Sequence, residues 1–409
     1  MNKVIVFVVL LANISCSLNF FKFSQNKPKF DDKEIEQNYC ISKNKLNIFG
    51  PDKNNIERFN SFLQLPHIKK SNYSFEEKFV LLVLYYFSAR PDLVSINSHT
   101  QLLDIQNKKF NYYETKVNND NSSNILGLLS RLLTNSNSKK SIIELIRAAQ
   151  LLFPNRFSIS DELAKSILTN KKVLYSSPTT KKHFFQAQHP LTSGESITKY
   201  PYKNLYKKIK MGPYLNENIL KTHNNNIQCN IDFNLYNNGI YPISQRKIES
   251  IVFGVQQNKR SLLAILHLNN SKYQPSSISP SNLNNINLPS IPFCFVNKKN
   301  RRIAYISLEG RDPGQHLFHL DQLGIENVNS VSDVVNRINF PRHIFLVNPM
   351  RIIFESKKMN TQQLDSFHKL DIPLYHVNTI GSIWAFADFG KTQSIIKDHR
   401  SNGIISCQK

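Results

Sequence analysis

The densest group of side chains that could carry out chemistry lies between Glu309 and His319, in the stretch EGRDPGQHLFH. A histidine or a glutamate can take the proton of an RNA 2′-hydroxyl, and a second histidine can protonate the leaving oxygen. Arg311 can stabilise the negative charge that develops on the phosphate. Glu309, Arg311, His316 and His319 therefore predict RNA cleavage that needs neither a metal nor another cofactor.

Two other interpretations of this stretch stay open. His316 and His319 are three residues apart, so on a helix they could bind a metal ion together with Asp312. The stretch could also be an ordinary turn from a strand to a helix, with histidines that only stabilise the fold. A polar cluster without a known spacing does not decide between a nuclease site, a metal site and a turn.

A second feature is the basic and aromatic segment KYPYKNLYKKIK, which begins at Lys199. Lysines can neutralise phosphates, and tyrosine rings can stack on unpaired bases. The alternative is a solvated basic loop whose tyrosines pack inward. The candidate RNA contacts are Lys199, Tyr200, Tyr202, Lys203, Tyr206, Lys207, Lys208 and Lys210.

The overall charge agrees with a polyanionic partner. Lys and Arg number 52 against 29 acidic residues, which gives a formal net charge of +23. Such an excess favours nucleic acid, anionic glycans or anionic membrane surfaces, although an AT-rich genome also raises the number of lysines. The sequence contains no Walker loop, no Gly-x-Ser-x-Gly, no His-Glu-x-x-His and no dinucleotide fingerprint, which disfavours the enzyme classes that depend on them.

The pattern of apolar residues predicts an α+β fold. Residues 18–170 are predicted to form a mainly helical domain, residues 171–230 a basic linker or long loops rich in Lys and Tyr, and residues 231–409 a mixed α/β sheet domain. Helices are expected near 55–63, 75–87, 142–152, 161–170, 331–338 and 360–370, and strands near 251–255, 262–266, 293–296, 303–308, 344–347, 374–377 and 383–386.

The beginning of the chain predicts secretion. Residues 1–17 combine a lysine, an apolar run and small residues, as in a cleaved signal peptide, and no further segment is apolar enough to cross a membrane. An oxidising route would allow disulfides and N-glycosylation. The disulfide candidates, whose pairing stays open, are Cys40, Cys229, Cys294 and Cys407, and the glycosylation candidates are Asn72, Asn121 and Asn269.

Together these features resemble the nuclease subunit of the linear-plasmid-encoded yeast killer toxins of the zymocin type. The shared features are a signal peptide, a basic AT-rich chain and a cysteine close to the C-terminus, here Cys407. The resemblance implies a secreted toxin that cleaves tRNA or rRNA of target cells and is linked by Cys407 to a carrier chain. It also implies a catalytic pair of one glutamate, Glu34 or Glu36, and one histidine, His316 or His319.

Two competing classes of function remain. The protein could be a secreted, non-enzymatic host-interaction protein or a protein that binds polyanions or glycans. It could also be a secreted hydrolase with an unfamiliar arrangement of catalytic residues. Dependence of an activity on His316 or His319 would separate a nuclease from a binding protein.

Overall fold

The structure is a computed structural model of the 409-residue chain. It describes residues 39–42, 45–106, 110–115, 125–208, 214–215, 221–224, 226–238, 247–268, 271–274, 277–282, 290–298, 301–355, 359, 361–390, 392–401 and 403–407.

The chain divides into two compact units, and each is assembled from segments that are far apart in sequence. Unit 1 comprises residues 1–43, 219–249 and 290–402. Unit 2 comprises residues 44–218, 250–289 and 403–409. Each unit combines an antiparallel sheet with helices, so the predicted α+β fold class is confirmed.

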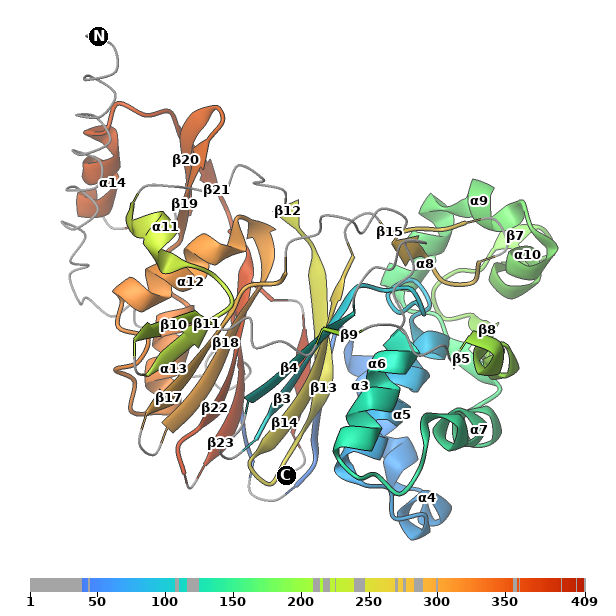
Figure 1. Ribbon diagram of the computed structural model, residues 1–409. Coiled ribbons are helices and arrows are strands. Elements are labelled where there is room, and N and C mark those ends of the chain that lie inside the picture. Colours follow the sequence, from blue (N-terminus) through green and yellow to red (C-terminus); the bar gives the residue numbers. More distant parts are fainter. Residues whose placement is uncertain are drawn as a thin grey trace. The chain divides into compact units, whose positions relative to one another are not determined.

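A seven-stranded antiparallel sheet is the centre of unit 2 (Figure 1). Its middle is the hairpin of β13 and β14, which continue in register from Ser250 opposite His267 to Gln257 opposite Arg260. The strands, in spatial order, are β24 (Ile404–Ser406), β2 (Asn47–Gly50), β13 (Ser250–Gln257), β14 (Arg260–His267), β3 (Thr100–Ile105), β4 (Phe110–Thr115) and β9 (Tyr214–Leu215).

Helices pack on one face of this sheet and form the main core of unit 2. The central helix is α5 (Phe75–Ala89), whose Tyr86 ring lies 4.8 Å from the ring of Phe253 on β13. The other helices of unit 2 are α3 (Lys53–Gln64), α4 (Pro66–Lys70), α6 (Ile125–Asn135), α7 (Ile142–Leu152), α8 (Asp161–Thr169), α9 (Lys171–Tyr175), α10 (Pro178–Phe184) and the 3₁₀ helix η1 (Tyr202–Lys208). The helices α9 and α10 form in the segment predicted as a linker, because Leu174 and Phe184 are buried.

Strand alternation determines which residues face these helices. Phe253 on β13 and Ala264 on β14 are opposite each other and belong to the helix-covered core. Since side chains alternate between the two faces of a sheet, Ser250 and His267 lie on the opposite face. The same rule places Gln101 of β3 on that opposite face, next to Leu102 of the core.

Capping boxes begin several helices where the sequence predicts them. Ser74 and Glu77 form one at the start of α5, and Ser141 and Glu144 form another at the start of α7. In unit 1, Ser330 and Asp333 form a capping box at the start of α13. Each cap satisfies backbone N–H groups that have no partner in the first turn of a helix, which confirms these predicted helix starts.

Unit 1 is built on an eight-stranded antiparallel sheet, in which α12 packs on β18 and α13 packs on β22 and β23. Between α13 and β22 along the chain, the strands β19, β20 and β21 form a smaller sheet. The strands are β1 (Tyr39–Ser42), β23 (Gln393–Lys397), β22 (Ser382–Asp388), β18 (Arg301–Arg311), β17 (Phe293–Lys298), β11 (Ile227–Cys229), β10 (Lys221–Asn224), β12 (Lys247–Ile248), β19 (His343–Val347), β20 (Met350–Glu355) and β21 (Leu374–Val377). The helices are α11 (Phe233–Asn237), α12 (Pro313–Gln322), α13 (Val331–Ile338) and α14 (Thr361–His368).

Short two-stranded sheets complete unit 2. They are β5 (Arg156–Ser158) with β8 (Ser196–Thr198), β6 (Phe185–Gln186) with β7 (His189–Pro190), and β15 (Ser271–Lys272) with β16 (Ser281–Asn282). Among the described residues, no helix is both long and apolar enough to span a bilayer.

One disulfide pairing is settled. Cys229 on β11 and Cys294 on β17 are opposite each other in register and form a disulfide. Cys40 and Cys407 are disulfide-bonded as well. Cys407 therefore has no free thiol for the predicted link to a carrier chain.

Candidate functional site

The two histidines of the predicted nuclease site lie in the core of unit 1. His316 has no exposed surface and His319 is 5% exposed, because α12 packs on β18. Burial, together with neighbouring positive charge, lowers the pKa of both imidazoles well below 6.5. Both rings are therefore neutral near pH 7, and neither is presented to a polymeric substrate.

The remaining residues of that predicted site are differently placed. Glu309 is partly exposed and Arg311 is exposed, at the end of β18. After burial, the groups with the strongest effect on the pKa of His316 are Arg342, His319, Arg400 and Asp398, in that order.

Two glycines surround the ring of His316. Gly310 and Gly381 both have positive φ angles, of 114° and 57°. A Cβ atom at Gly381 would lie 2.7 Å from His316 Nε2, and one at Gly310 would lie 3.2 Å from it. These glycines therefore allow the close packing that keeps His316 in the interior.

Asp312 serves the structure at the beginning of α12. Its carboxylate accepts hydrogen bonds from the Tyr236 hydroxyl at 2.8 Å and from the Gln315 side-chain amide at 2.9 Å. Burial raises its pKa, and these hydrogen bonds oppose that rise. Among the described residues, no three His, Cys, Asp or Glu side chains are grouped so that they could hold a metal ion.

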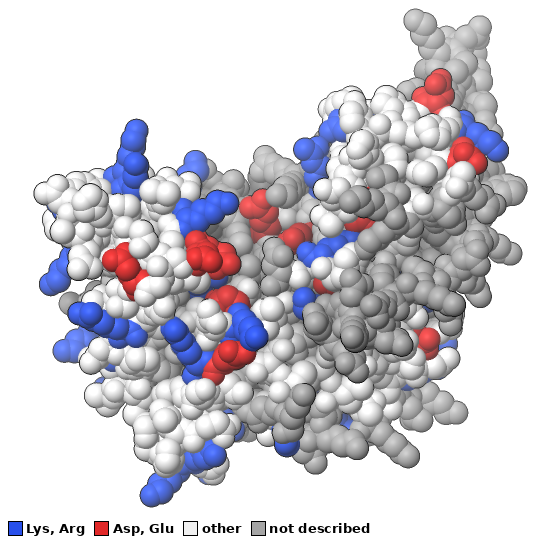
Figure 2. Space-filling model, turned by 180° about the vertical axis from the view of Figure 1, so that it is seen from behind, with Lys and Arg blue, Asp and Glu red and all other residues white. Residues whose placement is uncertain are grey.

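The predicted RNA-binding segment has partners within the protein. Lys199 Nζ donates hydrogen bonds to the backbone oxygens of Gln150 and Phe153, at 2.6 and 3.0 Å. The hydroxyl of Tyr202, a buried residue, donates to the Leu84 carbonyl at 2.6 Å, while Lys203 is exposed. On the face shown in Figure 2, Lys and Arg side chains are interspersed with Asp and Glu.

Several predicted positions lie outside the described residues. They are the signal peptide 1–17, Glu34, Glu36, Asn121, Lys210 and Asn269, and the side chains of Tyr206, Lys207 and Lys208. Asn72 is described and is exposed.

A different group of polar residues, in unit 2, is brought together by neighbouring strands. Ser250 is the first residue of β13 and is paired with His267, the last residue of β14. Directly opposite residues in an antiparallel sheet have Cβ atoms about 4.5–5.5 Å apart and point to the same face. Ser250 is 3% exposed and His267 is 1% exposed, whereas Glu249, immediately before Ser250, is exposed.

A second histidine extends this pair. The ring of His99 stacks on that of His267, with centroids 4.5 Å apart, and the His99 carbonyl accepts the backbone N–H of His267. On its other side, His99 Nε2 lies 2.8 Å from Glu114 Oε1. His99 therefore lies between His267, on which its ring stacks, and the Glu114 carboxylate.

Glu114 is held ionised at the end of this series. Burial alone would raise its pKa, but His99 and the hydroxyl of Tyr112 and the amide of Gln101 lower it to about 2. Tyr112 donates to Glu114 Oε2 at 2.6 Å and Gln101 donates to Oε1 at 3.1 Å. The side chains of this group are Ser250, His267, His99, Glu114, Gln101 and Tyr112, and we call them the β13–β4 polar cluster.

The electrostatic environment keeps His267 neutral. Burial is the largest cause that lowers its pKa well below 6.5; the charge of His99 adds to it and that of Glu114 opposes it. A neutral imidazole can accept a proton, and a serine hydroxyl becomes a nucleophile when a neighbouring base accepts its proton. Ser250 could therefore serve as a nucleophile and His267 as its base, with His99 and Glu114 beside the base. These are the groups that acyl transfer requires.

The fold is similar to that of a cephalosporin acylase and of LmbA2991. The sequence matches no protein-family model and no curated protein. A structure of a cephalosporin acylase from Bacillus halodurans matches 95% of this chain and 99% of its own, with a TM-score of 0.60 and 8% identity. Two structures of LmbA2991 match with TM-scores of 0.62 and 0.61, each at 8% identity; they cover 90% and 94% of this chain and 99% and 100% of their own.

These matches show the fold and overturn the killer-toxin resemblance. The features on which that resemblance was based, namely charge, a leader and a terminal cysteine, do not depend on the fold of the chain. Neither the comparisons nor the described residues support an RNA substrate or a carrier chain.

No pattern in the sequence predicted the β13–β4 polar cluster. Its members Ser250, His267, His99 and Glu114 come from four segments, so no local spacing connects them. A usable signal was present at the ends of two correctly predicted strands, where a serine precedes one apolar run and a histidine follows the next. Only the hairpin register places those two ends side by side.

Proposed function

We propose that the protein is a hydrolase or acyltransferase that opens an amide bond, with Ser250 as the nucleophile and His267 as the general base. The observation that carries the proposal is the pairing of a strand-initial serine with a buried, neutral histidine. The fold supports it, since an acylase has the same fold over 95% of this chain. The earlier interpretation as a ribonuclease toxin is wrong, because the matching folds are not those of a killer-toxin nuclease.

The reaction follows from the geometry of the pair. His267 takes the proton of the Ser250 hydroxyl while Oγ attacks the carbonyl carbon of the substrate amide. The carbon–nitrogen bond then breaks, and protonated His267 gives its proton to the leaving amine. Water, deprotonated by His267, attacks the resulting ester and releases a carboxylic acid, which restores the Ser250 hydroxyl.

His99 and Glu114 act as positioning residues in this scheme. The 4.5 Å stack with His99 and the 2.8 Å contact between His99 and Glu114 hold the His267 ring in place. A base that is held in place loses no orientational freedom when the substrate arrives, which lowers the barrier.

The disulfides support a location in an oxidising compartment. Secretion through the predicted signal peptide belongs to the same proposal.

Hydrolysis of a panel of amides by the full-length chain tests the proposal. The panel would contain cephalosporin C, because a fold neighbour is a cephalosporin acylase, and a set of acyl p-nitroanilides. We expect Ser250→Ala to reduce kcat/KM by about 10³ or more. The matched control is Ser261→Ala, a buried serine of β14 whose Oγ accepts a hydrogen bond from Gln256 at 3.1 Å. Equal loss in both variants, or no turnover of any amide by the wild-type chain, would argue against the proposal.

A further inference from the structure

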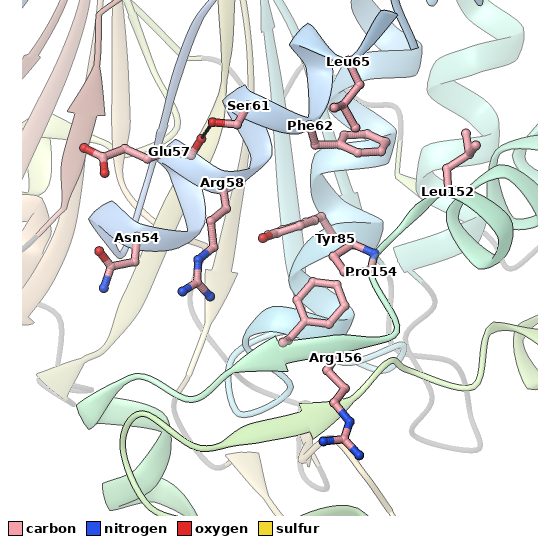
Figure 3. Close-up of a pocket in the computed structure, with 11 residues that line it drawn as sticks. Asn54, Glu57, Arg58, Ser61, Phe62, Leu65, Tyr85, Leu152, Pro154 and Arg156 are labelled. Atoms are coloured by element: carbon pink, nitrogen blue, oxygen red, sulfur yellow. Dashed lines mark hydrogen bonds between the residues drawn. The ribbon is translucent and has the colours of Figure 1, made fainter. Parts of the chain in front are cut away.

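A cavity of about 550 Å³ lies in the helical layer of unit 2 (Figure 3). Its residues come from one face of α3 and its C-terminal end, from α5, and from the stretch that runs from the end of α7 into β5. The volume is in the range of small-molecule sites, which is roughly 300–1,000 Å³.

The floor of the cavity is aromatic. Phe62, Tyr85 and Phe157 are all buried, and the Tyr85 ring lies 5.1 Å from that of Phe157. Tyr85 and Tyr86 are consecutive on α5 but face different sides: Tyr86 packs on the sheet, whereas Tyr85 lines the cavity. The cavity is therefore separated from the β13–β4 polar cluster by α5 and the sheet.

The Tyr85 hydroxyl is a buried donor that remains available for a ligand. Tyr85 is 2% exposed, and among the described residues its hydroxyl has no hydrogen-bond partner. Burial raises its pKa, an effect that the nearby Arg58 guanidinium opposes. The hydroxyl therefore stays protonated and can donate a hydrogen bond to a ligand in the cavity.

The rim of the cavity carries positive charge. Arg58 of α3 and Arg156 of β5 are exposed, and within the described part of the chain neither guanidinium forms an ion pair. The carboxylate of the rim, Glu57, lies 3.8 Å from Lys53 Nζ, so its charge is partly offset. Figure 3 shows both guanidiniums extending from the elements that border the aromatic floor.

We propose that this cavity binds a small amphiphilic carboxylate, with its apolar part on Phe62, Tyr85 and Phe157 and its carboxylate at the Arg58–Arg156 rim. The aromatic floor is complementary to the apolar part of such a ligand, and the positive charge at the mouth of the cavity is complementary to its anionic end. The Tyr85 hydroxyl and the two guanidiniums are all donors, and a carboxylate is an acceptor without a proton to donate.

Titration calorimetry with laurate, below its micelle concentration, and with the neutral 1-dodecanol tests this site. The double variant Arg58→Gln/Arg156→Gln should weaken laurate binding roughly tenfold and leave dodecanol unchanged. Arg147→Gln, on an exposed position of α7 outside the cavity, is the matched control and should bind laurate as the wild type does.

Two further variants connect the binding to the cavity. Ser61→Trp replaces an exposed lining residue by a bulky one, so it should abolish binding of both ligands while the circular dichroism spectrum is retained. Ser250→Ala should bind laurate normally, because the two sites are separate. Absence of laurate binding, equal affinity for laurate and dodecanol, or binding that survives Ser61→Trp would overturn the proposal.

Discussion

Ser250 and His267 lie directly opposite each other at one end of the β13–β14 hairpin, on the sheet face that does not carry the helical core of unit 2. The pairing depends on an unbroken register of eight residue pairs, because a slip by one residue would move one side chain to the other face. The hairpin therefore positions the proposed nucleophile and the proposed base on paired strands and not on loops.

The peptide bond between Glu249 and Ser250 lies at one of the boundaries between the two units, and its carbonyl is within one residue of the Ser250 hydroxyl. We expect the chain to be cut between Glu249 and Ser250, because the proposed nucleophile can attack the Glu249 carbonyl in the same way as a substrate amide. The Cys229–Cys294 disulfide spans this bond, so the chain must be reduced first; mass measurement of the reduced protein should then show two fragments, one that ends at Glu249 and one that begins at Ser250. Ser250→Ala should remain uncut, and a wild-type chain that retains its full mass after prolonged incubation would refute this prediction.

The pH profile of amide hydrolysis should report the environment of His267. The active form of the base is the neutral imidazole, and burial and His99 lower its pKa well below 6.5. The acid limb of kcat/KM should therefore lie below pH 6.5, because His267 remains deprotonated there. Glu114→Gln should move the limb to still lower pH, since the Glu114 charge raises the pKa of His267. An acid limb at or above pH 6.5 would indicate a different base.

Unit 1 should lose stability in acid because of its buried histidines. His316, His319 and His343 all have lowered pKa values; that of His343 is about 3, chiefly through burial. In the unfolded chain these histidines titrate near pH 6.5. Just below that pH, the folded state therefore binds fewer protons than the unfolded state. The stability that these three histidines contribute is complete above pH 6.5 and is lost as the pH falls below that value.

Urea unfolding at several pH values measures this effect. His316→Gln should give a flatter decrease of the unfolding free energy below pH 6.5, because one titrating group is gone. His368→Gln, on the exposed side of α14, should leave the slope unchanged. Identical slopes in the wild type and His316→Gln would show that His316 does not contribute.

A buried ion network in unit 1 should make a large contribution to stability. Asp398 has no exposed surface; it accepts a hydrogen bond from Arg342 and another from Arg400 Nη1 at 3.0 Å. Asp398→Asn would leave two buried guanidiniums with less compensating charge, so we expect a loss of about 3–5 kcal/mol in unfolding free energy. Asp365→Asn, at an exposed position of α14, is the control and should change stability by less than about 0.5 kcal/mol. A small effect of Asp398→Asn would contradict this estimate.

Local patterns predicted much of the secondary structure. The apolar runs at 251–255 and 262–266 are β13 and β14, and the capped segments at 75–87 and 142–152 are α5 and α7. These elements carry their periodicity and their end signals within a few turns or residues, so the sequence can reveal them.

The strands β3 and β4 were not predicted, for a physical reason. They contain polar residues that are buried, such as Gln101, Asp104 and Glu114, and such residues look like an irregular segment in the sequence. Asp104 is satisfied by Arg260 Nε at 2.8 Å and Glu114 by His99, and both partners are distant in the chain. The β13–β4 polar cluster could not be predicted for the same reason, because its members also come from separate segments of the chain.

Trapping the acyl group on the protein shows directly whether Ser250 is the nucleophile. The full-length chain would be mixed with an amide substrate, quenched in acid, digested and analysed by mass spectrometry. We expect an acyl mass on the peptide that contains Ser250, and we expect it to be absent in Ser250→Ala and retained in Ser261→Ala. An acyl group on any other residue would contradict the assignment of Ser250 as the nucleophile. So would turnover that leaves no adduct and continues in Ser250→Ala.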